Sequence, residues 1–360
     1  MSSEIVNDSH LLGDALALAG CDEEWRTVIF EALREAEIRA KDPAAFREQV
    51  RWPLILSLLR DVKTHRVVLE NGIVFDVSPD SRIEKALLLS RDSHPDHVWE
   101  PQTTKLLVRL AATASHTIVG GAYIGDQVVP MARTASGTVH AFEPMKHAFA
   151  RLLHHVEINN LQNVVAHRLG LWDRGDVKLR LRGHLALASS VAIDDNEAVD
   201  GETVQSISID EYVQARELTS VKLIMLDTEG GEENALLGAE ETIARNDPNI
   251  VFEVHRNFVD WTDGLEHTSI VRFLTSQGYQ VFAIRDFHNN YAMTGSPVEI
   301  IPVSQVYLDG PPHGFNVLAT KDMDLVDQLE LSVVTNVSPK LLLEKDPALH
   351  FPLSSRVERR

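Results

Sequence analysis

Two groups of residues in this chain have types and spacing that could carry chemistry. The first is a glycine-rich turn with an acidic residue behind it. The turn runs from Gly121 to Gly125, between an apolar stretch and a helical one, and Glu143 ends the next apolar stretch. Glycines let a backbone approach a ligand closely, and a carboxylate at that place accepts hydrogen bonds from ribose hydroxyls. The pattern predicts a nucleotide-like cofactor lying across the edge of a parallel sheet.

The second group is a set of carboxylates and a histidine that follow two later apolar stretches. Asp227 ends the stretch 222–227 and Glu229 follows it, while Glu253 lies near the end of the stretch 250–254 and His255 follows it. Doubly wound sheets bind ligands beyond the carboxyl ends of their strands, so these side chains converge if the two strands are neighbours. Carboxylates and histidine can take a proton or orient a substrate. We therefore predict catalytic roles for Asp227, Glu229 and His255.

The elements that must position these residues alternate between strand and helix from about Thr103 onward, which is typical of a parallel, doubly wound sheet. The fold class is therefore predicted to be α/β, with a Rossmann-like sheet. We expect strands near 117–120, 138–142, 163–168, 222–227, 250–254 and 280–284, and helices near 103–113, 125–134, 145–158, 232–245 and 267–277.

The rest of the chain is predicted to add a helical region, a hairpin and a tail. Asn71-Gly72 lies between two β-branched runs, which favours a hairpin. The expected divisions are an N-terminal helical region at 1–62, a hairpin and lid-like connector at 63–102, the sheet domain at 103–322 and a tail at 323–360. Within the sheet domain, 176–206 reads as an inserted hairpin, and Phe315–Thr320 as an antiparallel strand at or near an edge. We expect the N-terminal helices to cover the substrate or to form the surface of a homo-oligomer.

The composition argues against nucleic acid and membranes as partners. The formal net charge of the 360 residues is −19, whereas proteins that bind nucleic acid usually present a basic face. The apolar runs near 11–19 and 52–59 are too short to span a bilayer, and the first eight residues are acidic, unlike a secretory leader. The single cysteine, Cys21, excludes an intrachain disulfide and fits a reducing compartment. We expect a cytoplasmic protein that acts on small molecules.

The glycine turn by itself leaves the cofactor open. A dinucleotide fingerprint has glycine at three positions, and here Gly120 and Gly125 take the outer ones while Ala122 takes the middle one. S-adenosylmethionine uses the same turn with different spacing, and its ribose also requires an acidic residue. Glu143 satisfies both alternatives.

Several pieces together resemble the FkbM-type family of S-adenosylmethionine-dependent methyltransferases. They are Gly-Ala-Tyr-Ile-Gly ending at Gly125, Phe-Glu-Pro around Glu143, Asp227-Thr-Glu-Gly, and Phe-Glu-Val-His ending at His255. The resemblance covers roughly 115–285. It implies S-adenosylmethionine as the cofactor. The residues implied to bind it are Gly121, Ala122, Tyr123, Gly125, Asp126, Glu143, Pro144, Gly170, Leu171 and Asp227.

The resemblance also implies in-line methyl transfer to a hydroxyl of a small acceptor, either a sugar or a secondary metabolite. A magnesium ion is left open: Asp227, Glu229 and Glu253 offer oxygen ligands, but no residue is assigned to a metal. Two positions depart from the family pattern: Val119 stands where aspartate is usual, and Tyr123 where asparagine is usual. These departures keep a non-catalytic binding protein on the same fold as an alternative. An NAD(P)-dependent oxidoreductase is a more distant one.

Overall fold

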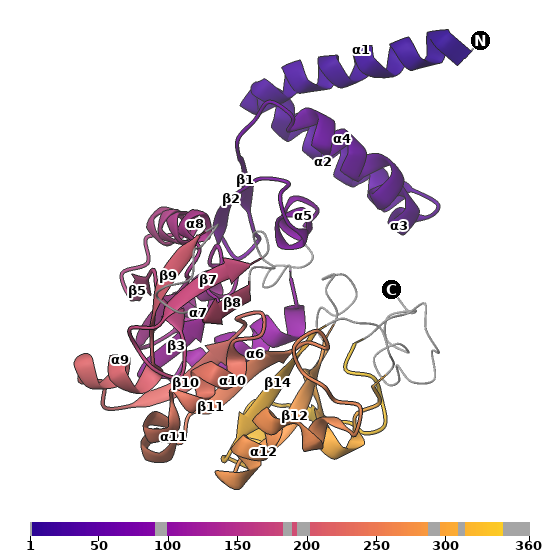
Figure 1. Ribbon diagram of the computed structural model, residues 1–360. Helices are drawn as coiled ribbons and strands as arrows, with labels where there is room; N and C mark the ends of the chain where they lie inside the picture. The colour runs from indigo at the N-terminus through magenta and orange to yellow at the C-terminus, as the bar shows by residue number, and fades with distance from the viewer. Residues whose placement is uncertain are drawn as a thin grey trace. The chain divides into compact units, whose positions relative to one another are not determined.

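The computed structural model describes residues 2–90, 99–182, 189–192, 202–286, 296–308 and 314–340. The chain divides into two compact units, Met1–Pro95 and Asp96–Arg360, which are described separately (Figure 1). Among the residues that the structure covers, no helix is both long and apolar enough to cross a bilayer.

The first unit is helical and ends in a hairpin and a short helix. Asp22 accepts a hydrogen bond from the backbone N–H of Trp25 at 3.0 Å, which caps the second helix. Gly72 turns the hairpin with a φ of 82°, so the predicted hairpin is confirmed. The elements are α1 (Ser2–Cys21), α2 (Glu23–Arg39), α3 (Pro43–Phe46), the π-helical η1 (Arg47–Arg51), α4 (Trp52–Leu58), β1 (His65–Val68), β2 (Val74–Val77) and α5 (Arg82–Leu88).

The second unit is built on a nine-stranded sheet of order β15-β13-β12-β14-β11-β10-β3-β4-β5. Its central strands β11, β10, β3, β4 and β5 are parallel, and the α/β doubly wound class predicted from the sequence is confirmed. The strands are β3 (His116–Gly120), β4 (Thr138–Phe142), β5 (Val164–His167), β10 (Val221–Leu226), β11 (Asn249–Val254), β12 (Gln280–Arg285), β13 (Glu299–Pro302), β14 (Phe315–Thr320) and β15 (Ser332–Val333).

Helices cover both faces of this sheet, because its strands carry apolar side chains on both sides. On one face Val119 and Met225 share a buried cluster with Leu106. On the other, Ile224 shares a cluster with Ile243. The first face is covered by α6 (Pro101–Ala111), α7 (Val128–Thr134), α8 (Lys146–Ile158) and α13 (Leu325–Gln328), and the second by α9 (Ile209–Ala215), α10 (Glu232–Leu237), α11 (Glu240–Asn246) and α12 (Ser269–Ser276).

The strand Phe315–Thr320 is antiparallel as predicted, but its predicted place at or near an edge is wrong. β14 pairs with β11 on one side and β12 on the other (Figure 1). All six of its residues are buried, which an interior strand requires and an edge strand does not. Beyond β12, β13 and β15 extend the sheet, so residues 323–340, assigned to a tail from the sequence, contribute its last strand.

Two further segments differ from their predicted form. The helix expected over 232–245 is interrupted at Gly238, where a Cβ atom would lie 2.1 Å from the Trp172 carbonyl oxygen. The side chain of Asp210 then accepts hydrogen bonds from the backbone N–H groups at the start of α11. The expected hairpin at 176–206 is part of a separate four-stranded sheet, which contains β6 (Gly170–Leu171), β9 (Thr203–Ile207), β7 (Lys178–Arg182) and β8 (Ser189–Ala192).

Candidate active site

The glycine turn after β3 is fastened to the end of β4. The backbone N–H groups of Gly121 and Ala122 both donate to the carbonyl oxygen of Phe142, at 3.0 Å each. Gly121 has a φ of 77°, and a Cβ atom there would lie 1.6 Å from the carbonyl oxygen of Asp227. Only glycine fits between the turn and the end of β10.

Glu143, the first residue after β4, holds the same turn with its side chain. One carboxyl oxygen accepts from the backbone N–H of Tyr123 at 2.7 Å, and the other from that of Met145 at 2.8 Å. The residue is 5% exposed. Burial raises the pKa of Glu143 to about 7, although these two hydrogen bonds oppose the rise. Each oxygen keeps a second lone pair that a ligand hydroxyl can use.

The other residues predicted to bind the cofactor in this region differ in conformation and burial. Tyr123 is buried and has a φ of 44°, a left-handed conformation that asparagine or glycine adopts more readily. Gly125 has a φ of 90°, and a Cβ atom there would lie 2.9 Å from Leu152 of α8. Asp126 and Pro144 are both partly buried.

Of the two predicted residues of β6, Leu171 has a side chain that packs beside Gly120, at the start of the turn. Gly170 and Leu171 are buried. A Cβ atom on Gly120 would lie 2.9 Å from side-chain atoms of both Leu171 and Leu226. The structure therefore brings Leu171 beside the turn that follows β3.

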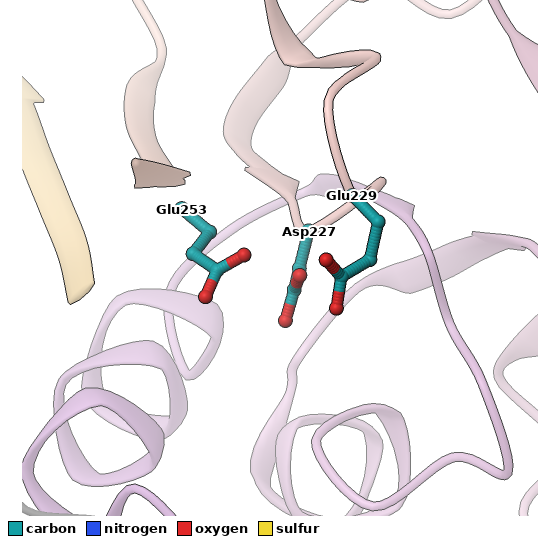
Figure 2. A group of neighbouring side chains, drawn as sticks. All are labelled: Asp227, Glu229 and Glu253. Carbon is teal, nitrogen blue, oxygen red and sulfur yellow. The ribbon is translucent and has the colours of Figure 1, made fainter. Parts of the chain in front are cut away.

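The carboxylates predicted at the ends of β10 and β11 do converge. Asp227, Glu229 and Glu253 each offer an oxygen atom, and these atoms all lie within 4.8 Å of one another. Figure 2 shows the three side chains directed toward a common point. We call these three residues the acidic cluster. No hydrogen bond or ion pair joins their carboxyl groups to any other residue in the described parts of the chain.

The electrostatics of the acidic cluster are unfavourable when all its members are ionised. Burial is the largest cause that raises the pKa of Asp227 and of Glu253 well above the usual range, and neighbouring negative charges raise both further. Burial, then the charge of Glu232, raises the pKa of Glu229 to about 7. The acidic cluster therefore holds protons near neutral pH or requires positive charge.

Four further residues lie around the acidic cluster, and sequence reasoning assigned none of them to the site. Glu100 precedes α6, is 4% exposed, and accepts a hydrogen bond from the side-chain amide of Asn316 at 2.6 Å. Lys340 lies 3.8 Å from its other carboxyl oxygen. Glu232 accepts from the backbone N–H groups of Thr228 and Gly230, so it shapes the loop that carries Glu229.

His255 lies next to the acidic cluster. A Cβ atom on Gly314 would lie 1.9 Å from a carboxyl oxygen of Glu253 and 3.0 Å from Cδ2 of His255. The ring nitrogen Nδ1 of His255 accepts a hydrogen bond from the backbone N–H of Asn257 at 3.0 Å. A neutral ring with this contact carries its proton on Nε2.

A cavity of about 730 Å³ opens beside the loop that follows β11. Phe258 connects it to the acidic cluster's loop, because a Cβ atom on Gly230 would lie 2.7 Å from the ring of Phe258. The cavity is lined by Arg256, Asn257, Phe258, Val259, Asp260, Trp261, Thr262, Gly264, Val306 and Leu308.

Comparison with protein families identifies a domain in the second unit. Residues 120–281 match the family model of the methyltransferase FkbM domain, while curated protein sequences give no significant match.

Solved structures match this chain with low sequence identity and low TM-scores. A methyltransferase FkbM from Methylobacillus flagellatus KT is 15% identical, with a TM-score of 0.37 over 66% of this chain and 52% of that chain. This chain thus spans about half the length of that protein. A precorrin-6y C5,15-methyltransferase from Geobacter metallireducens GS-15 is 12% identical, with a TM-score of 0.35 over 62% and 88%. P. horikoshii TYW2, in complex with MeSAdo, is 12% identical, with a TM-score of 0.37 over 72% of each chain.

The family match begins at the glycine turn and ends in β12, so it contains Glu143, the acidic cluster and His255. Residues 120–281 of this chain are thus similar to the methyltransferase FkbM domain.

Proposed function

We propose that this protein binds S-adenosylmethionine across the carboxyl ends of β3 and β4 and transfers its methyl group to a hydroxyl oxygen of a small acceptor. The observation that carries the proposal is the position of Glu143. Two backbone N–H groups fix its carboxyl group against the glycine turn, where a ribose would lie in a doubly wound sheet. A fixed carboxylate binds a diol without further ordering, which favours affinity.

The donor's adenosine lies over the turn, with Gly121 allowing close backbone approach and Leu171 offering an apolar contact. Its methionine end then extends toward the end of β10, where the backbone N–H of Asp227 donates to the carbonyl oxygen of Gly120 at 3.0 Å. The sulfonium is positively charged, and the acidic cluster is the nearest concentration of negative charge along that direction. Donor and acidic cluster are therefore electrostatically complementary.

Methyl transfer to a hydroxyl requires the acceptor oxygen behind the methyl carbon and a group that takes its proton. A carboxylate whose pKa lies near neutrality is a stronger base than an ordinary one, and Glu229 has a pKa of about 7. His255 was the other predicted base. Its neutral ring has the proton on Nε2 while Nδ1 accepts from Asn257, so in this conformation it donates a hydrogen bond to the acceptor.

The acceptor occupies the cavity beside β11. Phe258 and Trp261 offer aromatic faces, and Asp260 and Thr262 offer polar groups. Such a mixture suits a sugar or a hydroxylated secondary metabolite, whose rings have apolar faces and polar edges.

Isothermal titration with S-adenosylmethionine and with NADP⁺ tests the donor. We expect micromolar binding of the first and none of the second, and Glu143→Ala to raise the Kd at least about tenfold through the loss of two or more hydrogen bonds. The exposed Glu157→Ala on α8 is the control. Tighter binding of NADP⁺ than of S-adenosylmethionine would contradict the proposal.

An acceptor screen with labelled methyl groups tests the transfer. We expect label to enter hydroxylated small molecules and to be lost in Glu143→Ala. Donor binding without transfer to any member of a broad panel would favour a non-catalytic binding protein instead.

A further inference from the structure

We propose that the acidic cluster of Asp227, Glu229 and Glu253 is a site for one divalent, oxygen-preferring cation such as Mg²⁺, Mn²⁺ or Ca²⁺. Two ligands of one ion lie at most two bond lengths apart, which is about 4.2 Å for Mg²⁺ and about 5 Å for Ca²⁺. The carboxyl oxygens of the acidic cluster already lie within 4.8 Å of one another (Figure 2). Small side-chain movements are enough to bring all three onto one ion.

A second observation comes from Asn316, which no part of the proposed methyl transfer uses. Asn316 is 1% exposed and lies directly opposite Glu253 in the antiparallel pair of β11 and β14. Directly opposite residues project from the same face of a sheet. Its nitrogen donates to Glu100, but its oxygen Oδ1 has no hydrogen-bond partner among the described residues.

An unsatisfied carboxamide oxygen is costly inside a protein. The hydrogen bond to Glu100 fixes which end of the amide is nitrogen, so the atom without a partner is the oxygen. Carboxamide oxygens are ligands of hard cations, either directly or through a bound water. A cation between the carboxylates, or a water on it, would satisfy Oδ1.

The chemistry of the donor atoms selects the class of ion. All members of the acidic cluster offer oxygen, and oxygen ligands favour Mg²⁺, Mn²⁺ and Ca²⁺ over Zn²⁺ or Cu²⁺. Nδ1 of the neighbouring His255 already accepts a hydrogen bond from the backbone N–H of Asn257. A divalent cation also removes the repulsion among buried carboxylates, since they would otherwise bind protons in its place.

A cation here would deepen the function proposed above, and this role rests on that function. Three protein ligands leave positions on the ion for an acceptor oxygen. A hydroxyl bound there would be more acidic, and the carboxyl oxygen of Glu229 that does not bind the ion would take its proton. The ion would thus orient the acceptor and make its oxygen more nucleophilic. The binding of the cation itself does not depend on methyl transfer.

The first test is titration of chelator-treated, full-length protein with Mn²⁺, followed by electron paramagnetic resonance. We expect one bound Mn²⁺ per chain and competition by Mg²⁺ or Ca²⁺. Glu253→Gln keeps the size of the side chain and should weaken binding at least about tenfold. Glu233→Gln, an exposed neighbour on α10, is the matched control and should bind as the original protein does.

Thermal unfolding separates loss of the site from loss of the fold. Without metal, Glu253→Gln should unfold at a higher temperature than the original chain, because folding no longer has to protonate this carboxyl group or hold its charge beside two others. Added Mn²⁺ should stabilise the original chain and not this variant. Binding of Mn²⁺ by Glu253→Gln as tight as that of the original chain, or no stoichiometric Mn²⁺ at millimolar concentration, would overturn the proposal.

The same samples titrated with S-adenosylmethionine keep the two proposals apart. Mn²⁺ binding without donor binding would contradict the proposed function and leave the cation site standing. Donor binding without Mn²⁺ binding would do the reverse.

Discussion

The carboxyl groups at the ends of β4, β10 and β11 all have raised pKa values, yet their partners differ. Glu143 is fastened by two backbone N–H groups. The acidic cluster has other carboxyl groups as its main electrostatic neighbours, and its oxygens receive no hydrogen bond from the described residues.

The difference shows that the fold uses acidic side chains in two ways. At β4 the fold supplies hydrogen bonds that hold the carboxylate in one position, which suits recognition of a fixed ligand group. At β10 and β11 the fold assembles charges that repel one another, which lowers stability unless protons or cations are bound. Such a cost is typical of sites that do chemistry.

The largest expected effect comes from a substitution that creates a steric clash between the glycine turn and the end of β10. Gly121→Ala places a Cβ atom against the backbone of Asp227, and a φ of 77° is strained for alanine. We expect a loss of at least about 3 kcal/mol in the free energy of unfolding and no measurable binding of S-adenosylmethionine. Urea unfolding and calorimetry measure both.

Gly13→Ala is the control for this substitution, because a Cβ atom there meets nothing within 4 Å. Donor affinity of Gly121→Ala equal to that of the original chain would show that the turn does not approach the ligand.

The next effect concerns stability and pH at the acidic cluster. The folded-state pKa of Glu229 is about 7, whereas an unfolded glutamate titrates near 4.3. Between these pH values the folded chain holds a proton that the unfolded chain has lost, so stability falls as pH rises and levels off above 7. We expect a loss of about 2 kcal/mol from pH 5 to pH 8, after allowance for solvent screening.

Urea unfolding of metal-free protein at several pH values measures this loss. Glu229→Gln should reduce the slope and Glu233→Gln should leave it unchanged. An equal slope in the original chain and in Glu229→Gln would mean that Glu229 is ionised at the same pH whether folded or not.

The smallest effect concerns donor affinity and pH at Glu143. Its pKa is about 7, and only the ionised form accepts hydrogen bonds from both ribose hydroxyls. The Kd for S-adenosylmethionine should therefore fall about tenfold from pH 6 to pH 8, as the ionised fraction rises from about a tenth to about nine tenths. Calorimetry at three pH values measures this, and Glu143→Gln should bind weakly at all of them.

Local patterns predicted the turn and its carboxylate, because Gly121, Gly125 and Glu143 act through the backbone next to them in sequence. They also placed Asp227 and Glu253 at neighbouring strand ends. Local patterns did not predict Glu100 and Asn316 as part of the site. Glu100 comes from a loop before α6, and Asn316 faces Glu253 only because β14 is inserted between β11 and β12.

The position of β14 has a consequence for how the protein is made. Ribosomes deliver β11 and β12 before residues 315–320, so both strands emerge with an unpaired edge facing the gap that β14 later fills. Exposed edges of this kind invite pairing with other chains. We expect the nascent protein to depend on chaperones until β14 leaves the exit tunnel, and truncations that end before β14 to aggregate.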